Sequence, residues 1–180
     1  ILSYAGSFLP GKGGLEVINL AKILKQYQFN IAGNIEKKIM DQILNFDNLH
    51  WKGYLDDFEI LNFYEFSDIL IAPIGERIFL DIEKKNEITF YTSPLKLYEY
   101  SFTNKPILTV DRPCTRVFRK MPGVWFIDKD KSYSPNAWIE AINQINEYLK
   151  SNNYRVNLLK PRKKYIYNWE ERINEMINIK

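Results

Sequence analysis

Cysteine and histidine are nearly absent from this chain of 180 residues, which has one of each, Cys114 and His50. A single cysteine excludes a disulfide framework or a thiolate metal cluster built from this chain. A single histidine excludes a site that needs two imidazoles from it, and we interpret His50, inside an expected strand, as structural. No apolar run approaches the ~20 residues that a membrane-spanning helix needs. The scarcity of cysteine is typical of a reducing compartment, so we expect a cytoplasmic protein.

The net charge is small, at +3, and is too little to indicate a nucleic-acid partner. Hydrophobic residues make up 46% and charged residues 26% of the chain, as in ordinary globular proteins. The length suffices for one domain with a buried core. The chain begins at Ile1 without a methionine. We therefore expect an excised or renumbered part of a longer protein; the alternative is a complete small protein with a trimmed start.

Segments of strand-like and helix-like periodicity alternate along the chain, which predicts an α/β fold with a mainly parallel, Rossmann-like sheet flanked by helices. Strands are expected at 2–6, 29–33, 49–53, 68–73, 106–110 and 124–127. Helices are expected at 15–26, 36–44, 58–66, after Ser93, at 116–120, 135–150 and 169–179. The charged stretch 74–92 is expected to be a loop. Residues 1–160 would form one domain and residues 161–180 a helical tail.

A helix start with anion-binding potential is predicted at Ser93. Serine is a good N-cap, and Pro94 suits the first helical position because its missing N–H costs nothing there. The next amides, on Leu95 and Lys96, would then point out of the helix end, where they bind anions and above all phosphates.

Glu99 shares a helix face with Leu95 and Lys96 because it follows them by four and three residues. A carboxylate in that place accepts two hydrogen bonds from a vicinal diol such as a ribose. Phosphate donors and a diol acceptor one helical turn apart indicate a nucleoside diphosphate site. The alternative is an exposed carboxylate paired with Lys96 or Lys105, which is common on helix surfaces.

The turn after the first expected strand is rich in glycine and contains Gly6, Ser7 and Lys12. Ligands of open α/β sheets bind at the carboxyl ends of the strands, where glycine permits close approach and lysine supplies a charge for phosphate. The turn is not a Walker A loop, because Gly13 follows Lys12 where serine or threonine would be needed. The alternative is a glycine-rich turn with a solvated lysine.

The run Ser-Pro-Leu-Lys-Leu-Tyr-Glu-Tyr at 93–100, followed by Asn-Lys-Pro-Ile-Leu at 104–108, resembles the donor-binding motif of retaining glycosyltransferases with the two-domain, B-type fold. It is most similar to glycosyltransferase family 4. The resemblance runs from Tyr4 to Glu170 and covers the second half of such an enzyme, its nucleotide-sugar domain. The stretch 168–172 resembles the start of the helix that crosses back to the first domain.

The resemblance implies roles for particular residues. Gly6, Ser7 and Lys12 would lie at the donor phosphates, with Ser7 standing where the family usually has arginine. Glu99 would hold the ribose. Tyr91 occupies the place of the family's first glutamate, so contacts to the transferred sugar are not carried over.

The resemblance also implies that Tyr54 and Leu55 flank the nucleobase, since in the family the residues just after the glycine that ends the third strand do so. A tyrosine ring could stack on the base, and a leucine could pack against its edge. The alternative is a turn followed by a core residue.

The resemblance also implies a function. The complete protein would transfer a sugar from a nucleoside diphosphate donor to a glycan or lipid-linked acceptor, with retention, in polysaccharide biosynthesis. It would need no cofactor and no essential metal, and an N-terminal acceptor domain would be its partner. No catalytic residue is assigned to this chain, which alone would bind nucleotide without turnover. The alternatives are a non-catalytic nucleotide-sugar-binding domain, or a sugar-nucleotide 2-epimerase or phosphorylase of the same fold.

A dense basic cluster spans Lys160–Lys164, with aromatic residues after it. Such a cluster can contact anionic lipid, each charge contributing about 1 kcal/mol near the surface, which would place the protein at the inner membrane face. The alternative is a solvated linker between two helices.

Overall fold

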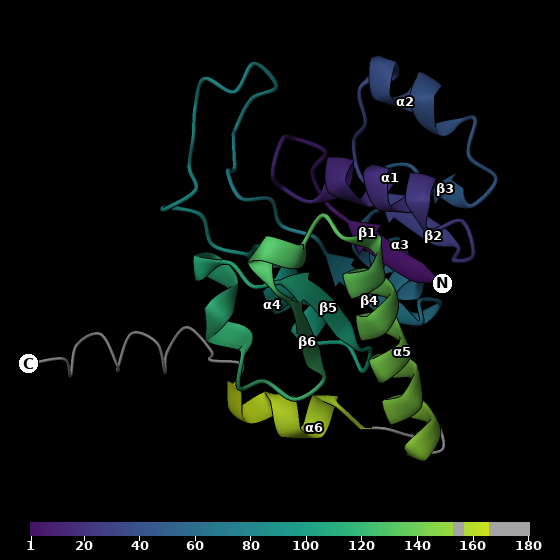
Figure 1. Cartoon of the computed structure of the whole chain (residues 1–180), viewed down its shortest axis with the longest axis vertical. Helices are drawn as coiled ribbons and strands as arrows, with labels where there is room; N and C mark the ends of the chain where they lie inside the picture. The colour runs from purple at the N-terminus through teal and green to yellow at the C-terminus, as the bar shows by residue number, and fades with distance from the viewer. Residues whose placement is uncertain (153–156, 166–180) are drawn as a thin grey trace, which may run out of the picture.

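The computed structural model describes residues 1–152 and 157–165, and within them one parallel sheet forms the centre of the molecule (Figure 1). Its order is β3-β2-β1-β4-β5-β6, so the direction of chain progression reverses between β1 and β4. Open α/β sheets bind ligands at that reversal, outside the carboxyl ends of the strands. The strands are β1 Leu2–Ala5, β2 Phe29–Ala32, β3 Leu49–Trp51, β4 Ile69–Ala72, β5 Ile107–Val110 and β6 Val124–Ile127.

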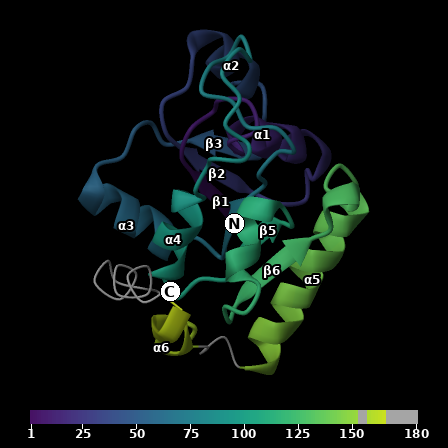
Figure 2. The same ribbon diagram turned by 90° about the vertical axis from the view of Figure 1, so that its left-hand side faces the viewer.

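Helices cover both faces of the sheet, and Figure 2 shows α3 and α4 on the opposite side from α5. The first face carries α1 (Gly14–Ile23), α2 (Lys37–Ile43) and α5 (Pro135–Ser151). The second carries α3 (Asp57–Glu65), α4 (Leu95–Ser101) and the 3₁₀ helix η1 (Pro113–Phe118). Two shorter 3₁₀ helices, η2 (Lys129–Lys131) and η3 (Lys163–Tyr165), and helix α6 (Leu159–Arg162) complete the described elements.

The strands are buried on both faces because helices pack against each of them. In β1, Tyr4 belongs to the core beneath α1 and α5, whereas Ala5 belongs to the core beneath α3 and α4. The same alternation in β4 sends Ile71 to the first core and Leu70 to the second. This two-sided burial is typical of parallel sheets, and the predicted fold class is confirmed.

The starts of α3 and η1 differ from the sequence prediction. α3 begins one residue early, because the Asp56 carboxylate accepts hydrogen bonds from Phe58 N (2.9 Å) and Glu59 N (2.8 Å). The expected basic helix at 116–120 is instead η1, which begins at Pro113. There the Thr115 hydroxyl accepts from Arg112 N (2.9 Å) and donates to Val110 O (2.8 Å), so the turn closes directly after β5.

Residues 74–92 form the expected loop, which rises away from the sheet in Figure 1 (teal). Its base is fixed to the turn after β1, since Gly75 N donates to Gly11 O (3.0 Å) and Phe79 N donates to Pro10 O (3.1 Å). Phe79 is also buried. A side chain on Gly11, whose φ is +76°, would collide with the backbone of this loop.

Arg162, inside the basic cluster, is completely buried and does not face solvent. Its guanidinium donates to four backbone carbonyls at the amino ends of β5 and β6, and burial lowers its pKa to about 10. These carbonyls belong to Pro122 (2.8 Å), Thr103 (2.8 Å), Lys105 (2.9 Å) and Gly123 (2.9 Å). Arg162 therefore anchors α6 to the sheet and cannot contact lipid. A membrane contact stays a prediction that rests on Lys160 and Lys163, which are exposed.

α6 crosses the predicted boundary between residues 160 and 161. The predicted closing helix, 169–179, lies outside the described residues. Within the described ranges, no helix is long and apolar enough to cross a membrane.

Ser3 provides a test of the packing of β1. Its hydroxyl is buried and, within residues 1–152 and 157–165, has no hydrogen-bond partner. A buried polar group without a partner costs free energy, so Ser3→Ala should raise the free energy of unfolding by about 1 kcal/mol. Ser67→Ala is the matched control, because that buried hydroxyl donates to Phe63 O at 2.7 Å. Urea denaturation of both variants checks this; a loss of stability in Ser3→Ala would contradict it.

Candidate functional site

The site begins where β1 and β4 separate. Their ladder pairs only Leu2 with Ile69 and Ser3 with Leu70. Beyond it, the hydroxyl of the fully buried Tyr100 accepts from Ala5 N (3.0 Å) and donates to Ile71 O (3.5 Å). One phenol from α4 thus satisfies backbone groups of both strands at the reversal of strand order. It holds α4 against the carboxyl ends of the sheet.

The start of α4 differs from the prediction at Ser93. The helix begins at Leu95, and Pro94 has φ −80° and ψ 65°, which are the angles of an inverse γ-turn. Leu95 N donates to Ser93 O at 2.9 Å, so this amide is used inside the turn and is not free for an anion. Neither Ser93 nor Leu95 lines a cavity at this site, and the Leu95 side chain is exposed.

A cavity of about 750 Å³ opens at the carboxyl ends of β1 and β2, on the face covered by α3 and α4. We call it the donor cavity, after the role that the sequence predicts for its residues. It collects five predicted residues, Gly6, Ser7, Tyr54, Leu55 and Glu99. These residues come from three separate segments of the chain, and the fold brings them together around one cavity.

Glu99 faces the donor cavity from α4. The hydroxyl of Tyr64, on α3, donates to Glu99 Oε2 at 3.3 Å. Burial, followed by the Glu99 carboxylate, raises the pKa of Tyr64, so the phenol stays protonated and remains a donor. One carboxylate oxygen is thereby oriented by α3, and Oε1, which accepts no hydrogen bond from the described residues, remains for a ligand.

The Lys96 ammonium lies against Gly6, which lines the donor cavity, but neither Lys96 nor Lys12 is itself a lining residue. Lys96 Nζ lies 4.4 Å from the centre of the Tyr4 ring and donates to Lys12 O at 3.4 Å. A methyl group at Gly6 would come within 2.7 Å of this ammonium, so glycine is needed for the approach. Burial is the main cause that lowers the pKa of Lys96 to about 8. The charges of Glu99 and Glu16 raise this pKa, and that of Lys12 lowers it.

Lys12 lies beside Lys96 in the turn between β1 and α1. The Tyr4 hydroxyl donates to Ser7 O (2.6 Å) and contacts Lys12 O (3.2 Å), which fixes both ends of the turn. Burial lowers the pKa of the Lys12 ammonium. The amino end of α1 is already occupied, because Glu16 accepts a hydrogen bond from Gly13 N at 3.1 Å.

The charge of Lys12 therefore acts on that of Lys96 near the switch in strand order. Among the described residues, neither Lys12 nor Lys96 takes part in an ion pair. Placing two partly buried cations together is unfavourable unless an anion neutralises them. The arrangement is therefore suited to a phosphate or diphosphate group at Gly6.

Tyr54 and Leu55 line the donor cavity together with Asp56 and Asp57. Tyr54 is 73% exposed and does not pack in the core. This favours the interpretation that its ring contacts a ligand over the interpretation that it is a core residue. Leu55 lines the same cavity and packs partly on the core beneath α3, so for this residue both interpretations hold. The Trp51 indole N–H donates to Gly33 O at 3.0 Å and so adjoins the cavity wall.

Several residues of this site were not predicted from the sequence. Asn34 lies two residues after the end of β2 and lines the cavity, and its place at the carboxyl end of a strand was a usable signal. Tyr64 and Phe102 also line it, but no local pattern distinguishes them from core aromatics. His50 lies on the edge strand β3, where Nε2 bonds Gln28 Oε1 at 2.8 Å, and takes no part. In the described ranges, no group of three His, Cys, Asp or Glu side chains could hold a metal ion.

Comparisons with known proteins place the fold. No protein-family model matches the sequence, and no curated protein matches it. Solved structures do match, over nearly the whole chain. TarM is 17% identical with a TM-score of 0.64, over 98% of this chain and 34% of that chain.

Two further solved structures match equally well. Sucrose-phosphate synthase from Thermosynechococcus elongatus is 15% identical with a TM-score of 0.67, over 99% of this chain and 44% of that chain. AviGT4, a glycosyltransferase involved in avilamycin A biosynthesis, is 12% identical with a TM-score of 0.65, over 99% and 52%. The fold is that of one domain of a B-type glycosyltransferase. The chain spans about a third to a half of the length of these structures.

Lys96→Met tests whether the site holds a costly charge. The folded pKa of about 8 lies below the ordinary 10.5, so the unfolded chain binds more protons between these pH values, and stability rises with pH through that window. At neutral pH the buried ammonium is a net cost. Lys96→Met, which keeps the apolar stem, should therefore be more stable there, by on the order of 1 kcal/mol.

The measurement is urea denaturation of both proteins from pH 7 to pH 10.5. The difference between them should shrink as Lys96 loses its proton. A variant less stable than the parent at neutral pH would contradict the expectation.

Proposed function

We propose that this chain is the donor-binding half of a glycosyltransferase, which binds a nucleoside diphosphate sugar in the donor cavity. The full protein would transfer the sugar, with retention, to a glycan or lipid-linked acceptor held by an N-terminal domain. The closer assignment to glycosyltransferase family 4 rests on the motif at 93–100 and belongs to the same proposal. So does the expectation that this half alone does not turn over.

One observation carries the proposal: Lys96 reaches Gly6 and the backbone of Lys12, neither lysine has an ion-pair partner among the described residues, and Glu99 lines the same cavity as Gly6. A diphosphate at Gly6 would neutralise the two lysines. Its ribose would then reach Oε1 of Glu99, and the base would extend toward Tyr54. The fold likeness supports this reading because AviGT4 is a glycosyltransferase.

The chemistry follows from charge. When the bond from the sugar to the diphosphate breaks, negative charge accumulates on the leaving phosphate. Two ammonium groups that are already in place and partly desolvated stabilise the transition state, in which this charge has developed, more than they stabilise the ground state. This difference lowers the barrier to sugar transfer. Tyr4 holds the backbone of both ends of the turn, so this stabilisation needs little reorganisation.

A non-catalytic nucleotide-binding domain is the second candidate. Ser7 offers no cation where an arginine would strengthen binding of the diphosphate, and Tyr91 is 89% exposed and provides no carboxylate near the sugar. Such a domain would bind nucleotide as this one does. An assay of the complete protein would distinguish the two candidates, because only a transferase would consume a donor sugar.

Lys12→Ala tests the phosphate end. Calorimetric titration of UDP and GDP should show about tenfold or greater weakening of the better ligand, since one charge-assisted contact is lost. The uncharged nucleoside should bind as before. The salt dependence of diphosphate binding should also flatten. Lys25→Ala removes an exposed lysine beyond the end of α1 and should have no effect. Equal losses for nucleoside and diphosphate would remove Lys12 from the site.

Glu99→Gln tests the ribose end. The variant keeps the shape of the side chain but loses a charged acceptor, which should weaken binding of the nucleoside diphosphate by about 1–3 kcal/mol. The preference for the ribonucleotide over its 2′-deoxy analogue should shrink in the variant. Glu140→Gln, on the exposed side of α5, is the control. An unchanged preference would show that Glu99 does not contact the ribose.

A further inference from the structure

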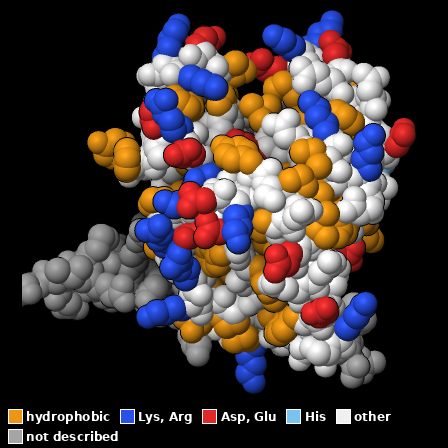
Figure 3. Space-filling model, in the orientation of Figure 1, with side chains coloured by type: hydrophobic (Ala, Val, Ile, Leu, Met, Phe, Trp, Pro, Cys, Tyr) orange, Lys and Arg blue, Asp and Glu red, His pale blue; other side chains and the backbone are white. Residues whose placement is uncertain are grey.

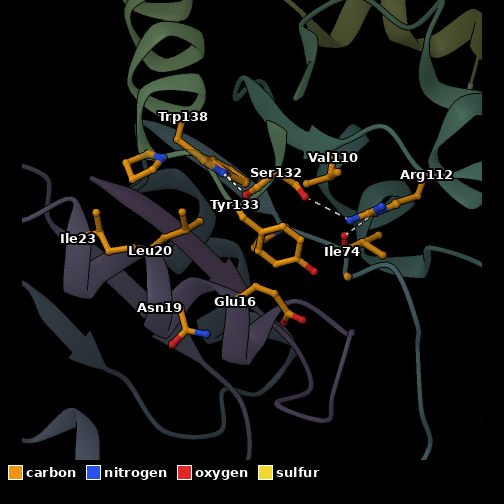
Figure 4. Close-up of a pocket in the computed structure, with 13 residues that line it drawn as sticks. Glu16, Asn19, Leu20, Ile23, Ile74, Val110, Arg112, Ser132, Tyr133 and Trp138 are labelled. Atoms are coloured by element: carbon orange, nitrogen blue, oxygen red, sulfur yellow. Dashed lines mark hydrogen bonds between the residues drawn. The ribbon is translucent and has the colours of Figure 1, made fainter. Parts of the chain in front are cut away.

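A second cavity, of about 100 Å³, lies on the other face of the sheet and shares no residue with the donor cavity. Figure 4 shows it between α1 and the start of α5, at the carboxyl ends of β4 and β5. We call it the Arg112 cavity. Neither the sequence motifs nor the proposed function assigns it a role.

Apolar side chains form most of its wall. Leu20, Val110 and Trp138 are buried and line it. The Trp138 indole N–H is already used by Ser132 O at 2.9 Å, so the ring offers the cavity its apolar surface. Such a wall favours an aliphatic group over water.

Arg112 supplies a buried cation in this apolar setting. Its side chain is 7% exposed, and it donates to Ile74 O and to Ser132 Oγ, each at 3.3 Å. Among the described residues, Arg112 forms no ion pair. A guanidinium has five N–H donors, and these two long bonds leave part of that capacity unused.

Arg162 shows what a purely structural buried arginine looks like in the same protein. It donates to four carbonyls at 2.8–2.9 Å and lines none of the cavities described here. Arg112 therefore makes fewer and longer hydrogen bonds than Arg162. A buried guanidinium that faces an apolar cavity with donors to spare is suited to an anionic oxygen ligand.

We propose that the Arg112 cavity binds a short-chain monocarboxylate. The carboxylate would pair with the guanidinium of Arg112, and the aliphatic tail would lie against Leu20, Val110 and Trp138. A cavity near 100 Å³ holds on the order of six non-hydrogen atoms, the size of butyrate. Glu16 also lines the cavity and repels each additional negative charge, which favours a monocarboxylate over a dicarboxylate or phosphate.

An entrance exists beside the cavity. Tyr133, which is 77% exposed, lines both the Arg112 cavity and a groove of about 390 Å³ next to the loop 74–92. Figure 3 shows this face of the molecule hollowed between that loop and the part that carries α1 and α2. A small ligand would pass from this groove by displacement of the Tyr133 ring.

Two tryptophans allow a direct test by nuclear magnetic resonance. The Trp138 indole N–H reports on the Arg112 cavity, and the Trp51 indole N–H, bonded to Gly33 O, reports on the donor cavity. Sodium butyrate is titrated into the isotope-labelled chain. A saturable shift of the Trp138 signal alone is expected, with a dissociation constant in the millimolar range for about six bound atoms. Butyramide, which has the same shape without charge, should bind at least about fivefold more weakly.

Variants assign the shift to the proposed contacts. Arg112→Gln should abolish the preference for butyrate over butyramide, whereas Arg116→Gln, an exposed arginine four residues along the same segment, should leave it unchanged. If Arg112→Gln does not fold, Ile23→Phe is the second variant. Ile23 is half-exposed and lines the cavity, so the larger ring should narrow the cavity and weaken butyrate binding while Arg112 is kept.

Three results would overturn the proposal: no saturable Trp138 shift with butyrate, equal binding of butyramide, or an equal loss in Arg116→Gln. UDP, titrated separately, should shift Trp51 and leave Trp138 in place. If UDP does not shift the Trp51 signal, that result would count against the donor cavity and not against the Arg112 cavity.

Discussion

The hydroxyl of Tyr100 is the contact on which the site depends. Parallel strands that part at a switch in strand order leave backbone groups without partners, and a buried N–H without a partner costs about 1–3 kcal/mol. Here one phenol satisfies Ala5 N and Ile71 O together. Because the phenol belongs to α4, the same contact sets where Lys96 and Glu99 stand. Stability of the sheet and geometry of the site are therefore coupled through one side chain.

Buried positive charge has a different use at each place in this fold. At Arg162 it is matched by four carbonyls and fastens α6 to the sheet. At Lys96 and Lys12 it lacks an ion-pair partner among the described residues, and burial lowers both pKa values. Sites that keep such charges give up stability for binding, since the cost is recovered only when an anion arrives.

The alternation of strand-like and helix-like segments was enough to predict the order and class of the elements, because each strand is short, apolar and bounded by turn residues. The cavity residues Gly6, Ser7 and Glu99 were also predictable, since carboxyl ends of strands and one helix face gather them. The γ-turn at Pro94 was not, because proline fits both a first helical position and that turn. The burial of Arg162 was not predictable either, because a run of basic residues does not show which of them will donate hydrogen bonds to buried carbonyl groups. Tyr64 and Tyr100 act across long stretches of chain, which no local pattern encodes.

The most direct measurement is a crystal structure of the chain with UDP or GDP bound. The diphosphate should lie between the ammonium groups of Lys12 and Lys96 beside Gly6, with the ribose hydroxyls on Glu99 and the base next to Tyr54. A nucleotide bound elsewhere, or bound in the donor cavity with its diphosphate away from both lysines, would contradict the donor-binding role.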